Sequence, residues 1–420
     1  MKQNLLLQFA LLFYFVSLNA YTKNQDYIKE TVEVSDFVGS EFHGYVDGVG
    51  DKTMFQLQSG ERFMSVSDDG SIFLIDGTSA QQRIRKITKD GTVSTICSPT
   101  TIPSQIINPN RIPFIDSMIY SGNNSFIIWS QSKDALFSVD EKFTTASIFK
   151  SGLLTGFSGY FCRGICIDNF GNTYFSTDNK VTKLYKNGLY EVFAGSGNAG
   201  FINGNGIFSS FSGTRFLTSD SESNIYVYDV GNVCVRKIDK SKNVTWLSGI
   251  NIPNIYVDGP KTKAVLGNIN GFASDNNDNI IFSSGSAIRR IDKFGNVQTI
   301  AGDAYRSGYY NAIGSEALFR EPKDLVCIGN SIFVFDRTRI RKITIGEGSS
   351  RKPFDKIDIK LSAGITINGT VGKKYSIESS SNGGKQWTGL TELELSKTPF
   401  TWYDENSVGT NNLYRVFETP

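Results

Sequence analysis

A single apolar position recurs at nearly constant spacing along most of this chain of 420 residues. It closes the third of four short strand-like runs in each unit and is occupied by Ile87, Val139, Leu184, Ile238, Ile291 and Ile343. The successive separations are 52, 45, 54, 53 and 52 residues. A period of this size with four strands in each unit is typical of the blades of a β-propeller. We therefore predict an all-β fold in which six blades stack in a ring and bury their faces against one another.

Residues 200–249 show the repeating unit most clearly. The unit begins with a turn-rich approach, GFINGNGIFSSF, and continues with two strand-like runs around a polar turn, TRFLTSDSESNIYVYD. Two further runs around a second turn, VCVRKIDKSKNVTWLSG, complete it. The 41 glycines and the 13% of aromatic residues in the chain suit strands joined by tight turns. The approach belongs to the loop that leads into the blade, so the fold unit is offset from the sequence repeat.

This offset predicts how the ring closes. The sixth unit ends with its third run, RIRKITIG, and continues into EGSSRKP without a fourth strand. The missing strand occurs at the other end of the propeller region, where TVEVSDFVG followed by GYVDG matches NVQTIAG followed by GYYNA. We therefore predict a propeller over residues 31–345 that is closed by its N-terminal strand, residues 31–39, which becomes the outer strand of the last blade.

Several of these runs resemble NHL repeats. They are GYVDGVGDKTMF before the first unit, the second strands GNTYF, SNIYV and DNIIF, and third strands of the type IRKI. The resemblance covers residues 31–345 and is weakest in the second unit. It implies a six-bladed propeller of a family that mostly supplies binding surfaces. Related six-bladed rings include metal-dependent lactonases and lyases.

The first 20 residues read as a signal peptide. Lys2 supplies a positive charge, residues 5–16 (LLLQFALLFYFV) form an apolar core, and SLNA ends at Ala20. An apolar core of this length is too short to span a bilayer, so we expect cleavage rather than anchoring. The sequence therefore predicts an exported protein, secreted or periplasmic, without a membrane span.

The composition changes after a linker at residues 346–354. Residues 355–420 combine alternating polarity with closely spaced turns, which predicts a small C-terminal β-sandwich. This segment also resembles a module appended to many secreted bacterial proteins, which implies a spacer or attachment role. The marks of the module are Gly369, Gly372, Tyr375, Ile377, Ser380, Trp387, Asp404 and Tyr414.

Charge and residue counts exclude several classes of function. The chain has 43 Lys and Arg against 41 Asp and Glu, whereas nucleic-acid binding requires a basic excess or stripe. His43 is the only histidine, so a zinc site or a catalytic triad would have to use it. We expect His43 to be a solvated loop residue and the five cysteines to be small buried side chains. We also expect a monomer without a cofactor.

Basic pairs recur on the third strands of four units. They are Arg85–Lys86, Arg236–Lys237, Arg289–Arg290 and Arg341–Lys342. Because they repeat with the unit, we interpret them as structural residues between blades, with alternate charges in water, rather than as a ligand-binding patch.

Alignment of the units on the segment Gly-Ile-x-x-Asp gives one candidate ligand site. Arg163, Arg215, Asn270 and Lys323 fall on one equivalent position, where each innermost strand begins, on the face of the interblade loops. Cations around a funnel of low dielectric constant would attract an anionic ligand. The alternative is a ring of polar side chains that hydrates an empty channel.

A second arrangement would use Asp116, Asn270 and Asp324 as oxygen ligands for calcium. The resemblance to lactonase-like rings implies this site, while the interleaved cations argue against it.

Two functions follow from these patterns. The first is an exported, non-catalytic binding or scaffold protein that recognises a protein or glycan with its interblade-loop face. The alternative is a calcium-dependent lactonase or hydrolase, in which metal-bound water performs the chemistry. The scarcity of carboxylates on the innermost strands places it second.

Overall fold

The computed structural model describes most of residues 31–346 and part of the segment that follows. The described ranges are 31–56, 64–77, 81–98, 115–130, 134–151, 164–252, 255–346, 363–367, 370–380, 386, 388–395, 400–404 and 413–418. The chain divides into two compact units, Met1–Ser349 and Ser350–Pro420. The predicted signal peptide and nearly all of the predicted linker lie outside the described residues and stay predictions.

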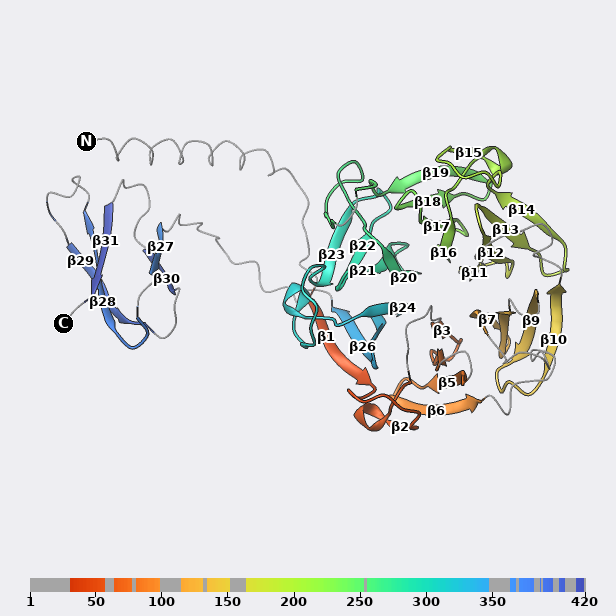
Figure 1. Cartoon of the computed structure of the whole chain (residues 1–420), viewed down its shortest axis with the longest axis horizontal. Coiled ribbons are helices and arrows are strands. Elements are labelled where there is room, and N and C mark those ends of the chain that lie inside the picture. The colour runs from red at the N-terminus through yellow and green to blue at the C-terminus, as the bar shows by residue number, and fades with distance from the viewer. Residues whose placement is uncertain are drawn as a thin grey trace. The chain divides into compact units, whose positions relative to one another are not determined.

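The first unit is a ring of six antiparallel sheets around a central axis (Figure 1). Blade 1 consists of β3 (Met64–Val66), β4 (Ile72–Asp76), β5 (Arg83–Ile87) and β6 (Thr92–Cys97). Blade 2 consists of β7 (Ser117–Gly122), β8 (Ser125–Ser130), β9 (Ala135–Asp140) and β10 (Ala146–Ser151). Blade 3 consists of β11 (Ile165–Ile167), β12 (Thr173–Thr177), β13 (Lys180–Leu184) and β14 (Tyr190–Ala194).

The second half of the ring repeats the pattern. Blade 4 consists of β16 (Thr214–Ser219), β17 (Ile225–Asp229), β18 (Cys234–Ile238) and β19 (Asn243–Ser248). Blade 5 consists of β20 (Ile269–Ser274), β21 (Ile280–Ser284), β22 (Ala287–Ile291) and β23 (Val297–Gly302). Blade 6 consists of β24 (Pro322–Ile328), β25 (Ser331–Asp336), β26 (Arg339–Gly346) and β1 (Thr31–Val38). The prediction of an all-β, six-bladed propeller is confirmed.

The N-terminal strand closes the ring as predicted. β1 pairs antiparallel with β26, from Thr31 opposite Gly346 to Val38 opposite Ile340. Val34 and Val38 are buried between blades, whereas Glu33 on the same strand is exposed. The innermost strands then follow one another around the axis, with β24 beside β3.

Each junction between neighbouring blades holds a cluster of buried apolar side chains. At the closing junction, Phe335 and Ile340 of blade 6 pack with Ile72 and Leu74 of blade 1. The second strands β4, β12, β17 and β21 are buried along their whole length. Neighbouring blades cover both of their faces, which is why they read as nearly continuous apolar or aromatic runs.

Several interblade loops wrap around the outer edge of the blade that they enter. β2 (Gly48–Val49) and β15 (Gly204–Asn205) pair as short fifth strands with β6 and β19. Three 3-10 turns occupy corresponding places in these loops, namely η1 (Gly50–Lys52), η3 (Gly206–Phe208) and η4 (Gly314–Glu316).

Four arginines hold these loops in place. Arg85, Arg236, Arg289 and Arg341 are the first members of the predicted basic pairs and are almost completely buried. In blade 4, Arg236 Nη1 donates to Asp229 Oδ2 at 3.2 Å, and Nη2 donates to Asn203 Oδ1 at 2.8 Å. Nη2 also donates to the carbonyl of Ile202 in the loop. The structure makes the interpretation of the basic pairs as structural residues more precise, because the first arginine of each pair joins the incoming loop to its blade.

The second unit contains two small antiparallel sheets, as the predicted β-sandwich requires. β27 (Ala363–Ile367) pairs with β30 (Phe400–Asp404). β28 (Lys374–Ser380) lies between β29 (Thr388–Glu394) and β31 (Leu413–Glu418). Tyr375, Ile377 and Leu395 form its described core.

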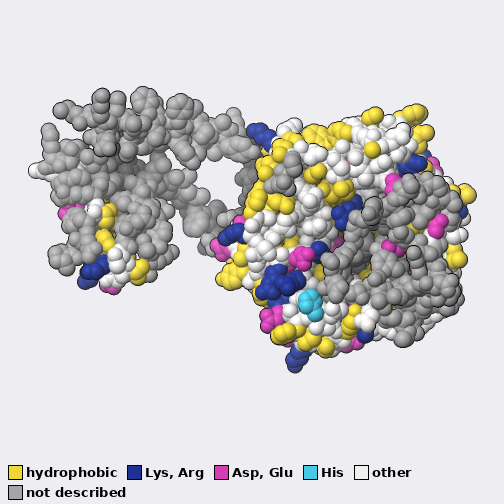
Figure 2. All heavy atoms as spheres, viewed as in Figure 1, with side chains coloured by type: hydrophobic (Ala, Val, Ile, Leu, Met, Phe, Trp, Pro, Cys, Tyr) yellow, Lys and Arg dark blue, Asp and Glu magenta, His cyan; other side chains and the backbone are white. Residues whose placement is uncertain are grey.

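No helix among the described residues is long and apolar enough to cross a membrane. Over the described face in Figure 2, basic and acidic side chains are interspersed.

Deleting residues 31–39 removes the outer strand of blade 6 and uncovers the edge of β26. We expect a fall of many degrees in the unfolding midpoint, measured by differential scanning calorimetry. Glu33→Ala, which changes an exposed residue of the same strand, should leave the midpoint nearly unchanged. A deletion variant as stable as the full chain would show that β1 does not close the ring.

Arg236→Met and Lys237→Met compare the two faces of one strand. Arg236→Met leaves Asp229 buried without its cation, and we expect a loss of about 3–5 kcal/mol in the free energy of unfolding. Lys237→Met changes a partly exposed side chain beside Asp220, and we expect a loss of about 1 kcal/mol or less in the free energy of unfolding. Urea titration measures both values, and equal losses would contradict the structural role of the arginine.

Candidate functional site

The ring surrounds an axial cavity of about 590 Å³ that is lined by residues of all six innermost strands. Each of these strands pairs on one side only, with the second strand of its own blade. Its other edge lies toward the axis (Figure 1). The cavity wall therefore presents backbone N–H and C=O groups that no sheet hydrogen bond satisfies.

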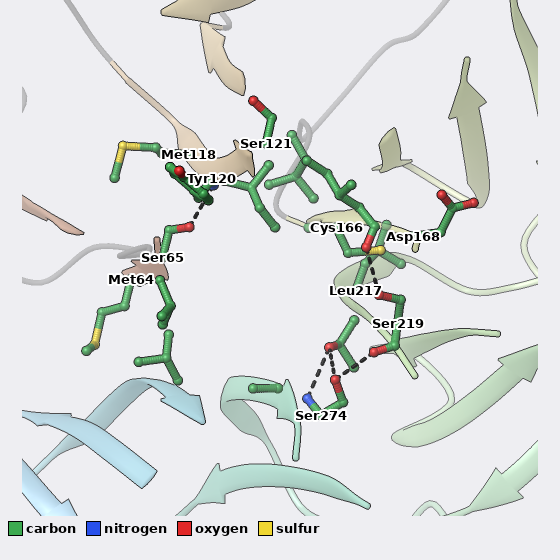
Figure 3. Close-up of a pocket in the computed structure, with 18 of the residues that line it drawn as sticks. Met64, Ser65, Met118, Tyr120, Ser121, Cys166, Asp168, Leu217, Ser219 and Ser274 are labelled. Atoms are coloured by element: carbon green, nitrogen blue, oxygen red, sulfur yellow. Dashed lines mark hydrogen bonds between the residues drawn. The ribbon is translucent and has the colours of Figure 1, made fainter. Parts of the chain in front are cut away.

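Side-chain hydroxyls cross-link the innermost strands along this wall (Figure 3). Ser65 of blade 1 accepts a hydrogen bond from the backbone N–H of Tyr120 in blade 2, at 2.7 Å. Ser219 of blade 4 donates to the carbonyl of Ile167 in blade 3, at 2.8 Å. Ser274 of blade 5 donates to the carbonyl of Ser219, at 2.6 Å. These bonds fix the hydroxyl oxygens in position beside the cavity.

The cavity reaches the end of the ring where hairpin turns follow the innermost strands. Asp68 and Asn169 line it and lie in the turns between the first and second strands of blades 1 and 3, and Gly122, which also lines it, ends β7 in blade 2. Lys186, in the turn between β13 and β14, lines it as well. Each innermost strand runs from the interblade-loop end of the ring to the hairpin-turn end. The mouth of the cavity formed by these turn residues therefore lies at the end opposite the interblade loops.

Asp324 is a buried carboxylate of the cavity wall. Its Oδ2 accepts the backbone N–H of Met64 in blade 1 at 2.6 Å, and its Oδ1 accepts that of Leu325 at 2.9 Å. Burial raises its pKa to about 7, in spite of these two N–H donors. At the equivalent positions Gly164 and Gly271, a side chain would collide with the backbone of the next blade. Asp324 thus fills a wider gap at the junction where the ring closes.

The other charged groups around the cavity give it an acidic balance. Asp168 is buried and accepts hydrogen bonds from the backbone of Asn172 and the hydroxyl of Tyr174. Asp68 accepts a hydrogen bond from the hydroxyl of Tyr120 at the mouth. The described lining residues include three aspartates but one basic residue, Lys186. This balance disfavours an anion inside the cavity.

The predicted ligand residues occupy equivalent places but do not line the described cavity. Arg215, Asn270 and Lys323 are each the second residue of an innermost strand, in blades 4, 5 and 6. The guanidinium group of Arg215 lies 4.8 Å from the centre of the Phe216 ring. Lys323 Nζ lies 2.7 Å from Oε1 of Glu321. Their part in binding an anion stays a prediction.

Arg163, the fourth member of the predicted set, lies outside the described residues. Asp116 immediately precedes β7, at the corresponding place in blade 2.

The calcium site predicted from Asp116, Asn270 and Asp324 stays a prediction. Asp116 and Asn270 belong to blades 2 and 5, which lie on opposite sides of a ring of six. Both carboxylate oxygens of Asp324 already accept backbone N–H groups. Calcium takes about six to eight oxygen ligands in close proximity. No group of three or more His, Cys, Asp or Glu side chains suited to a metal occurs among the described residues.

The remaining sequence predictions concern single residues. His43 is exposed in the first interblade loop, as expected. Cys97, Cys166 and Cys234 are buried and Cys327 is half-buried, which agrees with their interpretation as small interior side chains. Cys162 lies outside the described residues.

Sequence reasoning did not identify the hydroxyl groups of the cavity wall. The available signal was the serine that directly precedes the turn aspartate in LTSD and FASD, at Ser219 and Ser274. Serine beside aspartate is also ordinary turn chemistry, so the pattern did not stand out.

The fold defines the chain as a six-bladed β-propeller protein. It is similar to a protein of unknown function from Bacteroides thetaiotaomicron, with 18% identity, a TM-score of 0.58 and 76% of each chain covered. It is also similar to an auxiliary nutrient binding protein from the same organism, with 18% identity, a TM-score of 0.56 and coverage of 76% of this chain and 77% of that one. An auxiliary nutrient binding protein from Bacteroides ovatus has 14% identity, a TM-score of 0.56 and the same coverage.

At these identities the likeness shows the fold alone. No family model matches the sequence, so the resemblance to NHL repeats stays a prediction. No curated protein matches it.

Asp324→Asn tests the buried carboxylate at the closing junction. An acid whose pKa is raised by folding binds more protons in the folded state, so its contribution to stability falls as the pH rises from about 4 to about 7. The stability of Asp324→Asn relative to wild type should therefore rise over this range and level off above it, measured by urea unfolding. Asp51→Asn, at an exposed position on η1, controls for the loss of a charge. A difference that does not change with pH would show that Asp324 is solvated.

Proposed function

We propose that this chain is an exported, non-catalytic binding protein whose propeller recognises a protein or glycan ligand. The observation that carries the proposal is the axial cavity, which is lined by all six innermost strands and holds hydroxyl groups fixed by hydrogen bonds between blades. Its hydroxyls and buried carboxylates are engaged in bonds between blades or within turns. Groups fixed in this way suit the recognition of a ligand, which requires a preorganised surface.

The comparisons support the same class of function by analogy. Two of the similar structures are auxiliary nutrient binding proteins, and a binding role on the same fold agrees with that description. One fold serves many functions, so the proposal depends more on the cavity than on the similarity to these two structures.

The other segments of the chain have roles in this proposal as well. Residues 1–20 act as a signal peptide, which places the mature protein outside the cytoplasm, secreted or periplasmic. Residues 31–345 form an NHL-type propeller, and residues 355–420 act as a spacer or attachment module. The chain works as a monomer, without a cofactor and without a nucleic-acid partner. The interblade-loop face, with Arg163, Arg215, Asn270 and Lys323, provides a second surface for a large ligand.

A glycan array probed with the purified protein tests the binding role. We expect saturable binding to one class of glycan. Arg215→Ala/Lys323→Ala should reduce this binding at least tenfold if the ligand contacts the interblade-loop face. Lys293→Ala, an exposed residue of the β22–β23 turn, is the control.

Hydrolysis of sugar lactones that requires added calcium, together with an absence of binding, would contradict the proposal. That result would favour the calcium-dependent lactonase.

A further inference from the structure

We infer that the axial cavity binds a small, neutral, polyhydroxylated molecule, a mono- or disaccharide, that enters from the hairpin-turn end. The inference rests on the proposed binding function and makes it more specific. It moves small-ligand recognition from the interblade-loop end of the ring to the opposite end.

The size of the cavity suits such a ligand. Its volume of about 590 Å³ lies within the range of about 300–1,000 Å³ that is common for small-molecule sites. One or two sugar rings fit this volume, whereas a longer chain would have to extend out of the mouth.

The hydrogen-bonding groups of the wall match hydroxyls. Ser219 and Ser274 donate their hydrogens to backbone carbonyls, so their oxygens can accept hydrogen bonds. Ser274 Oγ also lies 3.1 Å from Thr218 Oγ1 and accepts from that hydroxyl, which leaves it one lone pair for a ligand. Thr218 also lines the cavity and accepts the backbone N–H of Ser274 at 3.1 Å. The edges of the innermost strands that face the axis add backbone groups, several of which already bond hydroxyls or carboxylates of the neighbouring blade. A sugar hydroxyl donates and accepts at once, and so it satisfies both kinds of group.

The charges favour a neutral ligand. Three aspartates and one lysine line the cavity, which opposes the binding of an anion. A cation finds little support, because Asp324 and Asp168 already accept hydrogen bonds from protein groups. Only Asp68, at the solvent end, has an exposed carboxylate.

An exposed aromatic ring lies beside the mouth. Phe170 is 66% exposed, and its neighbours Asn169 and Gly171 both line the cavity. The turns that follow the innermost strands are all described, and only this one, DNFGN, carries an aromatic residue. An aromatic face beside polar groups suits the apolar C–H face of a sugar ring.

Isothermal titration calorimetry with glucose, galactose, mannose, N-acetylglucosamine, maltose, cellobiose and lactose tests the inference. We expect saturable binding of at least one sugar, and weakening on the order of tenfold in Phe170→Ala. Lys186→Trp and Ser121→Trp place a large side chain at the mouth and should abolish binding. Ser241→Trp, in an exposed turn on the outer edge of blade 4, should bind as wild type does. Circular dichroism confirms that each variant folds.

The outcomes separate this inference from the proposed function. Binding on the glycan array without heat from any of these sugars would overturn the cavity assignment and leave the binding role standing. Equal affinity in wild type and both tryptophan variants at the mouth would also overturn it. Preferential binding of inorganic phosphate or spermidine would show that the assignment to a neutral ligand is wrong. Failure on the array and with the free sugars would overturn the cavity assignment and the glycan form of the proposed function, and it would leave only a protein as the ligand.

Discussion

In four of the six blades, the structure depends on a buried arginine that joins the incoming loop to its blade. Arg236 shows the arrangement: one side of its guanidinium group bonds Asp229 at the end of the second strand, and the other bonds Asn203 in the loop. Burial raises the pKa of Asp229 in spite of this cation and of the hydrogen bonds from Asn232 and Ser212. The pair therefore contributes chiefly by fixing where the loop lies, which a non-directional apolar contact would not do.

Each of these buried arginines has an aspartate partner, but the position of that aspartate differs among the blades. Blades 1, 4 and 6 carry both, as Arg85 with Asp76, Arg236 with Asp229 and Arg341 with Asp336. In blade 5, Arg289 pairs instead with Asp258 of the loop. Blades 2 and 3 have Phe137 and Thr182 at the position of the arginine, and Ser130 and Thr177 at that of the aspartate. Removal of only one partner would leave a buried charge uncompensated, which explains why both are absent together.

The sequence was sufficient to predict the architecture because the spacing of the repeat is the spacing of apolar residues that are buried between blades. Val139 and Leu184 close the third strands of the two most divergent blades, and both are buried as their counterparts are. β1 was predictable because β26 needed a partner along its outer edge. The axial cavity was not predictable, since Ser219 and Ser274 read as turn residues until the strand edges are placed beside each other. The alignment placed Arg215, Asn270 and Lys323 at equivalent strand positions, but it carried no information on which residues line the axial cavity.

A crystal structure of the protein soaked with the tightest-binding saccharide tests the account most directly. The account predicts one sugar in the axial cavity, with hydroxyls within hydrogen-bonding distance of Ser219, Ser274 and the edges of the innermost strands. Density beside Arg215 and Lys323 at the interblade-loop end, with an empty axial cavity, would contradict it.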